Sequence, residues 1–347
     1  MQDTARTPRG LDSLLDLGFV RADSPPPAAV EFQLGPGGRK LIVGRPAMGT
    51  VVRVTAMTPS RDRAEEAVGR AFEELDRLVA IFSRHDADSA LSQLNDAGHV
   101  DAAPPELAAV MNRALRYHRL TGGGFDVSVA PLVDLFASRR DGTPIARSEL
   151  VDARALVDAR NIRVGRRRIG FRREGMRVTL DGIAKGFIVD AFARILEHHR
   201  IRDYLVDAGG DIRVSGTKGG RMPWRIAVQD PAKAGRFPDT IELRGGAVAT
   251  SGGYERHYDR GQERHHIVDA GTGRSPMHSA SVSVVAPTAM TADALATSIF
   301  LMAPQRGVAF VDALRGCECL IVDRYGGQFR SRGWRSAAAA HDAEAEA

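Results

Sequence analysis

Asp293 and Thr297 stand four residues apart in the segment T-A-D-A-L-A-T, which has the pattern of a helix. Residues at this spacing lie on the same face of an α-helix, so the carboxylate and the hydroxyl would point the same way. With a backbone carbonyl they would form a set of hard oxygen ligands, which suits Mg²⁺ when diphosphate oxygens complete its octahedron. An Asp near the start of a helix is more often only a cap or a dipole partner, and spacing alone favours that simpler interpretation.

The segment D-G-I-A-K-G from Asp181 to Gly186 stands between a predicted strand and a predicted helix. Backbone N–H groups at the start of a helix have no partner within the helix, so they suit a phosphate. Lys185 would add a positive charge there, and a free carbonyl just before the helix could face a metal ion. The alternative interpretation is a surface lysine after a tight turn.

Three further segments combine glycines with polar side chains. They read T-G-G-G-F-D from Thr121, D-A-G-G-D from Asp207 and T-S-G-G-Y from Thr250. Each of them could be only a turn that needs a positive φ angle. Bare backbone amides beside such groups can also approach a phosphate or a ring closely. None of the segments matches the P-loop or the dinucleotide-binding fingerprint, so neither of those folds is indicated.

His265 and His266 are adjacent, and two adjacent side chains on an extended segment point to opposite sides. At most one of them is therefore expected in a site. A neutral imidazole is a common general base near pH 7, whereas a lone histidine is more often a structural residue. The histidines show no H-x-x-x-H spacing, so a zinc site is not expected.

The elements that position these residues follow from hydrophobic periodicity. Helices are predicted at Arg61–Phe82, Pro105–Leu120, Ser148–Ala159, Lys185–His199 and Thr291–Met302. Strands are predicted at Leu41–Val43, Val51–Ala56, Met176–Leu180, Tyr204–Val206, Asp211–Ser215, Trp224–Val228, Thr240–Leu243 and Ser281–Val285, and a hairpin at Cys319–Asp323 and Gln328–Ser331. Because strands and helices come in unequal runs, we expect an α+β fold rather than a doubly wound parallel sheet.

The chain of 347 residues can form one large domain or two intimate subdomains. Residues 1–38 contain a Pro-Pro-Pro run and a Gly-rich end, and we expect them to form a flexible extension. Residues 334–347 are Ala-rich and acidic, which predicts a disordered tail. The folded domain is therefore expected to span residues 39–333.

The composition limits the kinds of ligand and the cellular location that we expect for this chain. A net charge of +5 favours anionic ligands such as nucleotides, but the arginines are spread along the chain, so no nucleic-acid partner is expected. No run of 18 apolar residues exists, which predicts no transmembrane segment. The N-terminal segment has no apolar core of a secretory signal, so the sequence as written predicts a cytoplasmic protein. A periplasmic location is the alternative if the start is misassigned.

Taken in chain order, these segments resemble the ApbE family of FAD:protein FMN transferases. The segments that carry the resemblance are M-G-T from Met48, F-S from Phe82, S-A-L-S-Q-L-N from Ser89, T-G-G-G-F-D-V-S-V-A-P-L from Thr121, G-I-A-K-G-F-I-V-D from Gly182, L-V-D-A-G-G-D from Leu205, A-T-S-G-G-Y-E-R from Ala249, H-I-V-D from His266 and A-D-A-L-A-T from Ala292. Single pieces are common, but their order and spacing over about residues 40–332 are specific.

The resemblance implies a T-fold-like α+β architecture, with mixed or antiparallel sheets, flanking helices and FAD in a cleft between two subdomains. It implies an FAD site formed by Met48, His85, Gly124, Phe125, Asp126, Thr179, Lys185 and Ile267. It places a Mg²⁺ ion on the carbonyl of Gly182 and the side chains of Asp293 and Thr297. It assigns His266 to acid/base work, beside Lys185 and Asp181 as further catalytic candidates.

Two segments depart from the family pattern. The usual D-x-G-G-I-A-K-G is replaced here by a segment in which the acidic residue, Asp181, comes two places later. The carbonyl ligand, Gly182 or Ala184, and the general base, His266 or Asp181, therefore stay open. The family's D-P-R-T-G reads D-A-G-T-G from Asp269, without the rigid proline and the arginine.

The function implied is the Mg²⁺-dependent transfer of FMN from FAD to a Thr or Ser hydroxyl of an acceptor protein that bears a flavinylation motif, with release of AMP. The first alternative is an FAD-binding protein or an FAD pyrophosphatase, in which water replaces the acceptor hydroxyl. The second alternative, from another class, is a basic binding module without catalysis.

Overall fold

The computed structural model describes residues 29–35, 38–139, 143–229, 231, 237–259, 261 and 263–337. A nine-stranded sheet forms the centre of the fold, and each strand pairs with its neighbours in antiparallel fashion. In spatial order the strands are β1 (Ala29–Gly35), β2 (Gly38–Ala47), β3 (Thr50–Thr58), β7 (Asp203–Ala208), β8 (Asp211–Ser215), β11 (Gly245–Gly252), β12 (Ser279–Ala286), β13 (Glu318–Asp323) and β14 (Gln328–Arg330).

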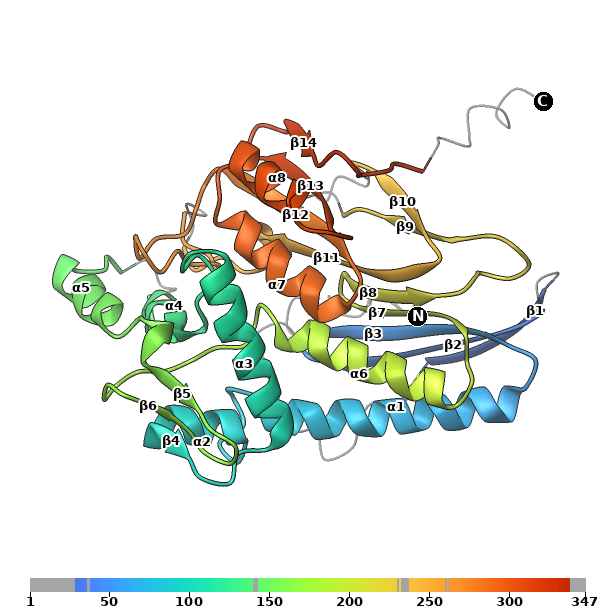
Figure 1. Cartoon of the computed structure of the whole chain (residues 1–347), viewed down its shortest axis with the longest axis horizontal. Helices are drawn as coiled ribbons and strands as arrows, with labels where there is room; N and C mark the ends of the chain where they lie inside the picture. Colours follow the sequence, from blue (N-terminus) through green and yellow to red (C-terminus); the bar gives the residue numbers. More distant parts are fainter. Residues whose placement is uncertain are drawn as a thin grey trace, which may run out of the picture.

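Three helices, α1 (Arg61–Phe82), α6 (Ala184–His198) and α7 (Ala289–Phe300), lie side by side and cover one face of this sheet (Figure 1). The apolar residues of α1 recur every three or four positions, and they are buried against the sheet and α6. The side chain of Ser60 caps α1 by accepting the N–H of Arg63. Helix α8 (Pro304–Asp312) packs against β13.

A second group of elements lies at one end of the helix layer, on the left in Figure 1. It contains α2 (Ala90–Ala97), α3 (Pro105–Leu120), α4 (Ala130–Ala137), α5 (Arg147–Ala155), and a small sheet of β4 (His99–Val100), β6 (Ile169–Phe171) and β5 (Ile162–Val164). A two-stranded ribbon of β9 (Trp224–Ala227) and β10 (Thr240–Leu243) packs an apolar cluster on the other side of the main sheet. Short 3₁₀ turns occur at Val127–Val129, Ala159–Asn161 and Gly253–Glu255.

The predicted α+β class is confirmed, and α1 and α3 have the predicted bounds. The other three predicted helices are present with shifted ends, and the predicted terminal hairpin forms between β13 and β14. The strand predicted at Met176–Leu180 is wrong, because the backbone of Val178 is paired with a side chain rather than with a strand.

The predicted domain limits can be compared with the described residues at both ends. Strand β1 lies within the segment 1–38 that was predicted as an extension, so the sheet begins before residue 39. At the other end, Trp334 is buried and its Nε1–H donates to Asp239 Oδ2 at 2.9 Å. The rest of the predicted extension, residues 1–28 and 36–37, and the rest of the predicted tail, residues 338–347, lie outside the described residues.

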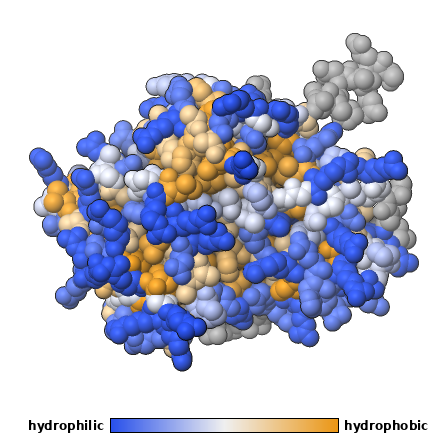
Figure 2. Space-filling view, in the orientation of Figure 1, coloured by the Kyte–Doolittle hydropathy of each residue, from blue (hydrophilic) through white to orange (hydrophobic). Residues whose placement is uncertain are grey.

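The face shown in Figure 2 is mostly hydrophilic, with apolar residues gathered over α7 and α8. None of the described helices combines the length and the apolar composition that crossing a membrane requires.

Candidate functional site

Helices α6 and α7 come into backbone contact at Gly186. A Cβ atom built on Gly186 would lie 2.5 Å from the carbonyl oxygen of Ala289, so no side chain fits there. The carboxylate of Asp190 accepts the N–H groups of Ala289 at 2.9 Å and Met290 at 3.0 Å. These N–H groups belong to the first turn of α7 and have no partner within the helix. Asp190 therefore fixes the start of α7 against α6.

Asp293 lies on α7 and faces the first turn of α6. Its side chain is buried, and Oδ2 accepts the N–H of Gly186 at 3.0 Å. Asp293 is thus a cap, but of the neighbouring helix rather than of its own, whose N-cap is Thr288. Burial, and next the carboxylate of Asp211, raise the pKa of Asp293 well above its usual range. A cation beside this carboxylate would offset the cost of ionising it in a buried position.

Thr297 lies one turn after Asp293 on the same face of α7, as predicted. A Cβ atom built on Gly182 would lie 2.9 Å from Thr297 Oγ1, so the Gly182 backbone packs directly against this hydroxyl. Ser251 Oγ, at the end of β11, lies 3.2 Å from the same oxygen. Two of the three residues predicted to hold a metal, Gly182 and Thr297, are therefore in contact, and Asp293 lies on the same face of α7 as Thr297.

Lys185 stands in the first turn of α6, and its Nζ lies 3.2 Å from Asp211 Oδ2. Asp211 follows the turn Gly209–Gly210, where both φ angles are positive, at 66° and 97°, as this two-residue hairpin requires. Burial opposes the charge of Lys185, but the carboxylates of Asp211 and Asp293 outweigh that effect and raise the pKa of Lys185. The ammonium is therefore charged at neutral pH.

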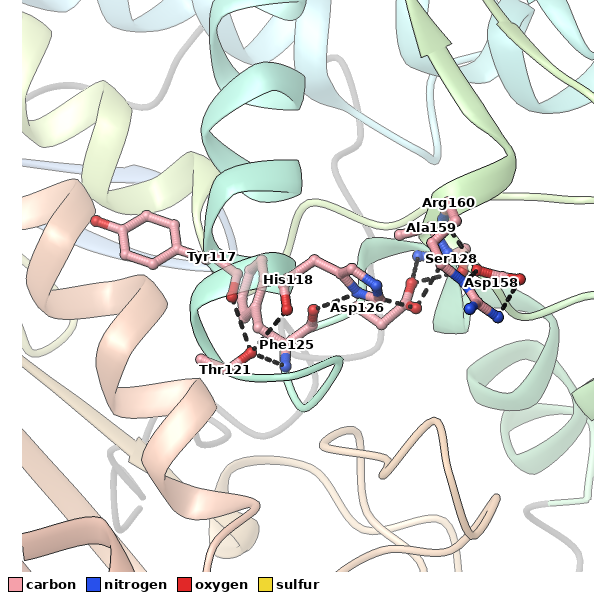
Figure 3. Close-up of polar contacts among 9 residues, drawn as sticks. All are labelled: Tyr117, His118, Thr121, Phe125, Asp126, Ser128, Asp158, Ala159 and Arg160. Carbon is pink, nitrogen blue, oxygen red and sulfur yellow. Dashed lines mark hydrogen bonds and ion pairs between the residues drawn. The ribbon is translucent and has the colours of Figure 1, made fainter. Parts of the chain in front are cut away.

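The loop after α3 carries Gly124, Phe125 and Asp126. Thr121 Oγ1 donates to the carbonyl of Tyr117 at 2.8 Å and accepts the N–H of Phe125 at 2.9 Å, which folds the loop back onto α3 (Figure 3). The ring of Phe125 packs edge-on against Tyr117 and is buried.

Asp126 is oriented by the protein itself. Oδ1 accepts the N–H of Ser128 at 2.8 Å and its hydroxyl at 2.5 Å, while Oδ2 accepts the N–H of Ala159 at 3.1 Å (Figure 3). His118 Nδ1 lies 3.3 Å from the same Oδ2 and donates to the carbonyl of Phe125 at 3.1 Å. Because these bonds involve both oxygens of a buried carboxylate, Asp126 shapes the loop around Phe125.

The segment before Lys185 is held from two sides. The side-chain amide of Asn95 donates to the carbonyl of Val178 at 2.9 Å and accepts its N–H at 2.7 Å. Thr179 N–H then donates to the carbonyl of Val127 at 2.8 Å, and Thr179 Oγ1 accepts the N–H of Asp181 at 3.3 Å. The Asp181 side chain is about half exposed, with Oδ2 3.9 Å from Arg84 Nη1.

The two adjacent histidines have different surroundings, as their alternation predicts. His265 accepts the N–H of Ile267 at Nδ1 and donates from Nε2 to the carbonyl of Pro276, at 3.3 and 3.0 Å. His266 lines the cavity described below, and its buried Nδ1 has no hydrogen-bond partner among the described residues. Burial, and next the neighbouring His265, lower the pKa of His266 to about 4, so its imidazole is neutral at pH 7.

These segments enclose one cavity of about 180 Å³. The predicted residues that line it are Gly124, Phe125, Asp126, Thr179, Asp181, Gly182, Lys185, His266, Ile267, Asp293 and Thr297. Further lining residues, which were not predicted as site residues, include Thr250, Ser251, Glu255 and Asp211. Asp211 is the acidic residue that ends the segment D-A-G-G-D, and this was the sequence signal that could have identified it.

Met48 and His85 are not among the residues that line this cavity. Met48 has a φ of 53° in the turn between β2 and β3 and packs against the main core. This turn lies close to the cavity wall, because a Cβ built on Gly209 would be 2.4 Å from Thr50 Oγ1. His85 follows α1, and burial, then the nearby Arg84, lower its pKa.

Charge is distributed unevenly over the cavity wall. Five carboxylates line it, from Asp126, Asp181, Asp211, Glu255 and Asp293, whereas Lys185 is the only lysine or arginine among the lining residues described. In the described part of the chain, no three His, Cys, Asp or Glu side chains are grouped to hold a metal ion. A cation here would therefore need hydroxyl and carbonyl oxygens, and oxygens of its substrate, as further ligands.

Residues 48–321 match the family model described as the ApbE family. The chain is 28% identical over 305 residues to the FAD:protein FMN transferase of Escherichia coli K12, covering 83% of this chain and 85% of that protein. It is 32% identical over 285 residues to the enzyme of that name from Vibrio cholerae serotype O1, covering 77% and 83%.

Solved structures of ApbE proteins have the same fold as this chain. The ApbE protein from Thermotoga maritima superimposes with a TM-score of 0.77 at 30% identity, covering 84% of this chain and 97% of that one. The flavin transferase ApbE from Vibrio cholerae has a TM-score of 0.73 at 28% identity, covering 88% and 98%.

Proposed function

This chain belongs to the ApbE family, and we propose that it transfers FMN from FAD to a Ser or Thr hydroxyl of an acceptor protein, releasing AMP. One observation carries this proposal. A single cavity is lined by Lys185, His266, Asp293 and Thr297, which come from segments far apart in the chain. An ammonium, a neutral imidazole and a set of hard oxygen ligands are the groups that phosphoryl transfer needs.

We propose that Mg²⁺ is held by the side chains of Asp293 and Thr297 and by the carbonyl of Gly182. The donor set fits, because Gly182 packs against the Thr297 hydroxyl and Asp293 is a buried carboxylate whose ionisation needs a counter-charge. The surplus of carboxylates on the wall points the same way, since they would repel a bare diphosphate. When bound, the ion would supply neutralisation of the diphosphate charge.

Lys185 would act beside the leaving group. Its ammonium is held at the cavity wall and stays charged, so it would stabilise the negative charge that develops on AMP as the P–O bond breaks. Such a charge acts without reorganisation, because Asp211 already fixes its position.

His266 would take the proton of the acceptor hydroxyl. The hydroxyl oxygen forms a bond to the phosphorus of the FMN half, the bond from that phosphorus to the AMP oxygen breaks, and the proton moves to the imidazole. Both His266 and Asp181 line the cavity, but His266 is favoured because its imidazole Nδ1 is buried and has no hydrogen-bond partner among the described residues, whereas the Asp181 carboxylate is half exposed and near Arg84.

The loop around Phe125 and the segment at Thr179 would bind the flavin half. Both are fixed before any ligand arrives, by Asp126 and by Asn95, so their positioning is part of the fold. Preorganised walls of this kind favour transfer to a positioned hydroxyl.

The test is to incubate the protein with FAD, Mg²⁺ and an acceptor protein that bears a Ser/Thr flavinylation motif. A denaturing gel viewed under ultraviolet light should show a fluorescent acceptor band, and AMP should be released in equal amount. An acceptor whose target Thr is replaced by Ala, and a reaction with EDTA, serve as controls that should show no band.

The other outcomes distinguish the alternatives. Release of AMP without a fluorescent band would indicate an FAD pyrophosphatase. If FAD does not bind at all, both enzyme functions are wrong and the non-catalytic binding module becomes the better interpretation.

A further inference from the structure

We propose that Asp211 is a positioning residue of this site, whose carboxylate holds the Lys185 ammonium in place for the departing AMP. The inference rests on the proposed function, because that function places Lys185 beside the leaving group. Asp211 was not predicted as a site residue, and it acts here through Lys185 rather than on the substrate.

The geometry singles out Asp211 among the carboxylates of the cavity. Its side chain is only 3% exposed, its Oδ2 lies 3.2 Å from Lys185 Nζ, and it lines the cavity itself. By contrast, the side chain of Asp181 is 48% exposed and pairs with Arg84, and Asp293 is engaged by the N–H of Gly186. Asp211 is therefore the carboxylate that is held in a fixed position and that points at Lys185.

The fold fixes Asp211 more firmly than a surface loop could. It is the first residue of β8, it pairs with Ala208 across a two-residue turn, and Gly209 of that turn packs against Thr50. In the same turn, Asp207 Oδ1 accepts the N–H of Gly210 at 2.9 Å. A short hairpin of this kind leaves the strand register little freedom.

A lysine needs such a partner here. Its side chain has four rotatable bonds and is about a third exposed, so an unpaired ammonium could move among the several carboxylates of the wall. The ion pair with a buried, fixed carboxylate removes that freedom before the substrate binds. This is preorganisation, which benefits the transition state more than the ground state.

Replacing the Asp211 carboxylate should have opposite effects on FAD binding and on turnover. Asp211→Asn keeps the size of the side chain but removes one negative charge from the cavity. The anionic FAD should then bind as tightly as before or more tightly, whereas kcat should fall by about tenfold or more, because the ammonium is no longer fixed. A purely structural role would instead weaken FAD binding and turnover together.

The experiment is a double-mutant cycle with Asp211→Asn, Lys185→Met and the double variant. FAD affinity is measured by flavin fluorescence, kcat by AMP release with a saturating acceptor, and folding by thermal unfolding. Asp207→Asn is the matched control, since it changes a carboxylate of the same turn that does not line the cavity, and an Asn oxygen can still accept the N–H of Gly210. It should retain wild-type kcat and FAD affinity.

We expect Asp211→Asn to change kcat less than about twofold in the Lys185→Met background, because the two residues act as a unit. We also expect Lys185→Met alone to lower the Tm, since it leaves a buried carboxylate unpaired, and the double variant to recover part of that loss.

Three results would overturn the inference: an unchanged kcat in Asp211→Asn, additive losses in the cycle, or loss of FAD affinity together with kcat in a folded protein. If Asp211→Asn does not fold, the double variant decides, because it should fold and match Lys185→Met in kcat. If the wild-type protein binds FAD but transfers nothing, the proposed function fails, and the inference that depends on it fails for that separate reason.

Discussion

The carboxylate of Asp293 accepts the backbone N–H of Gly186 at 3.0 Å, although the two residues are 107 positions apart. In the opposite direction, Asp190 of α6 accepts the first two N–H groups of α7. Each helix therefore accepts backbone N–H groups from the first turn of the other. A proposed ligand of the metal is thus also part of the contact between two core helices.

This double role decides how the metal proposal should be tested. Asp293→Asn keeps an oxygen that can accept the Gly186 N–H but removes the charge that a divalent cation needs. We expect a folded protein whose Mg²⁺ affinity, measured by calorimetry, falls by more than about tenfold, and whose FMN transfer is nearly abolished. Asp293→Ala should lose activity and also stability. Full activity of Asp293→Asn at low Mg²⁺ would refute the metal assignment.

The pH dependence follows from His266. Because burial lowers the pKa of its imidazole to about 4, the ring is neutral and able to accept a proton at every pH above that value. As the pH falls through about 4 the ring becomes protonated, so kcat/KM should decline there. His266→Ala should lower kcat by roughly 10²–10⁴-fold and remove this acidic limb.

Asp181→Asn is the comparison that separates the two candidate bases. It changes a half-exposed carboxylate of the same cavity, and we expect a much smaller loss of kcat with the acidic limb retained. If Asp181→Asn instead causes the larger loss, Asp181 is the base.

The helix contact at Gly186 makes a stability prediction. Gly186→Ala would place a Cβ atom 2.5 Å from the Ala289 carbonyl oxygen, so the free energy of unfolding should fall by about 1–3 kcal/mol. Gly69→Ala is the control in an exposed part of α1, where a new Cβ meets nothing within 4 Å. It should instead raise the free energy of unfolding by roughly 0.5–1 kcal/mol. Urea unfolding of both variants measures the difference, and equal effects would contradict the close contact.

Asn95 should contribute to both stability and binding. Asn95→Ala removes two hydrogen bonds and leaves the buried N–H and carbonyl of Val178 unpaired, which should cost about 1–3 kcal/mol. FAD affinity should fall as well, because Thr179 follows directly and lines the cavity. Gln93→Ala on the exposed side of the same helix should change the free energy of unfolding by less than about 0.5 kcal/mol. An Asn95→Ala protein as stable as wild type would contradict the role of this clamp.

Local sequence patterns were sufficient to predict the long helices. Helices α1 and α3 have three- and four-residue periodicity with clear starts, at Ser60 and Pro105, and the structure has the predicted bounds. Asp293 and Thr297 lie on one face of α7 as their spacing requires, and the Gly-rich segments meet at one cavity.

Three of the misses share one cause, which is pairing between distant segments. Residues 176–180 have the composition of a strand, but Asn95 takes the place of a partner strand, and no local pattern reveals that. Strand β11 is rich in Gly and small residues, and it is a strand because β8 and β12 lie on its two sides. Asp211 was missed in the same way, since its partner Lys185 lies on another element.

The reciprocal caps of α6 and α7 also limit how this site can vary between related proteins. A substitution at Gly186 or Asp293 changes ligand binding and helix docking at once, so it would have to be tolerated on both counts. Glu255 lines the same cavity from a short turn outside these two helices, so a substitution there would change the cavity without changing the contact between α6 and α7. We therefore expect substitutions on the Glu255 side of the cavity to alter the site alone, whereas substitutions on the α6–α7 side alter the site and the docking of the two helices together.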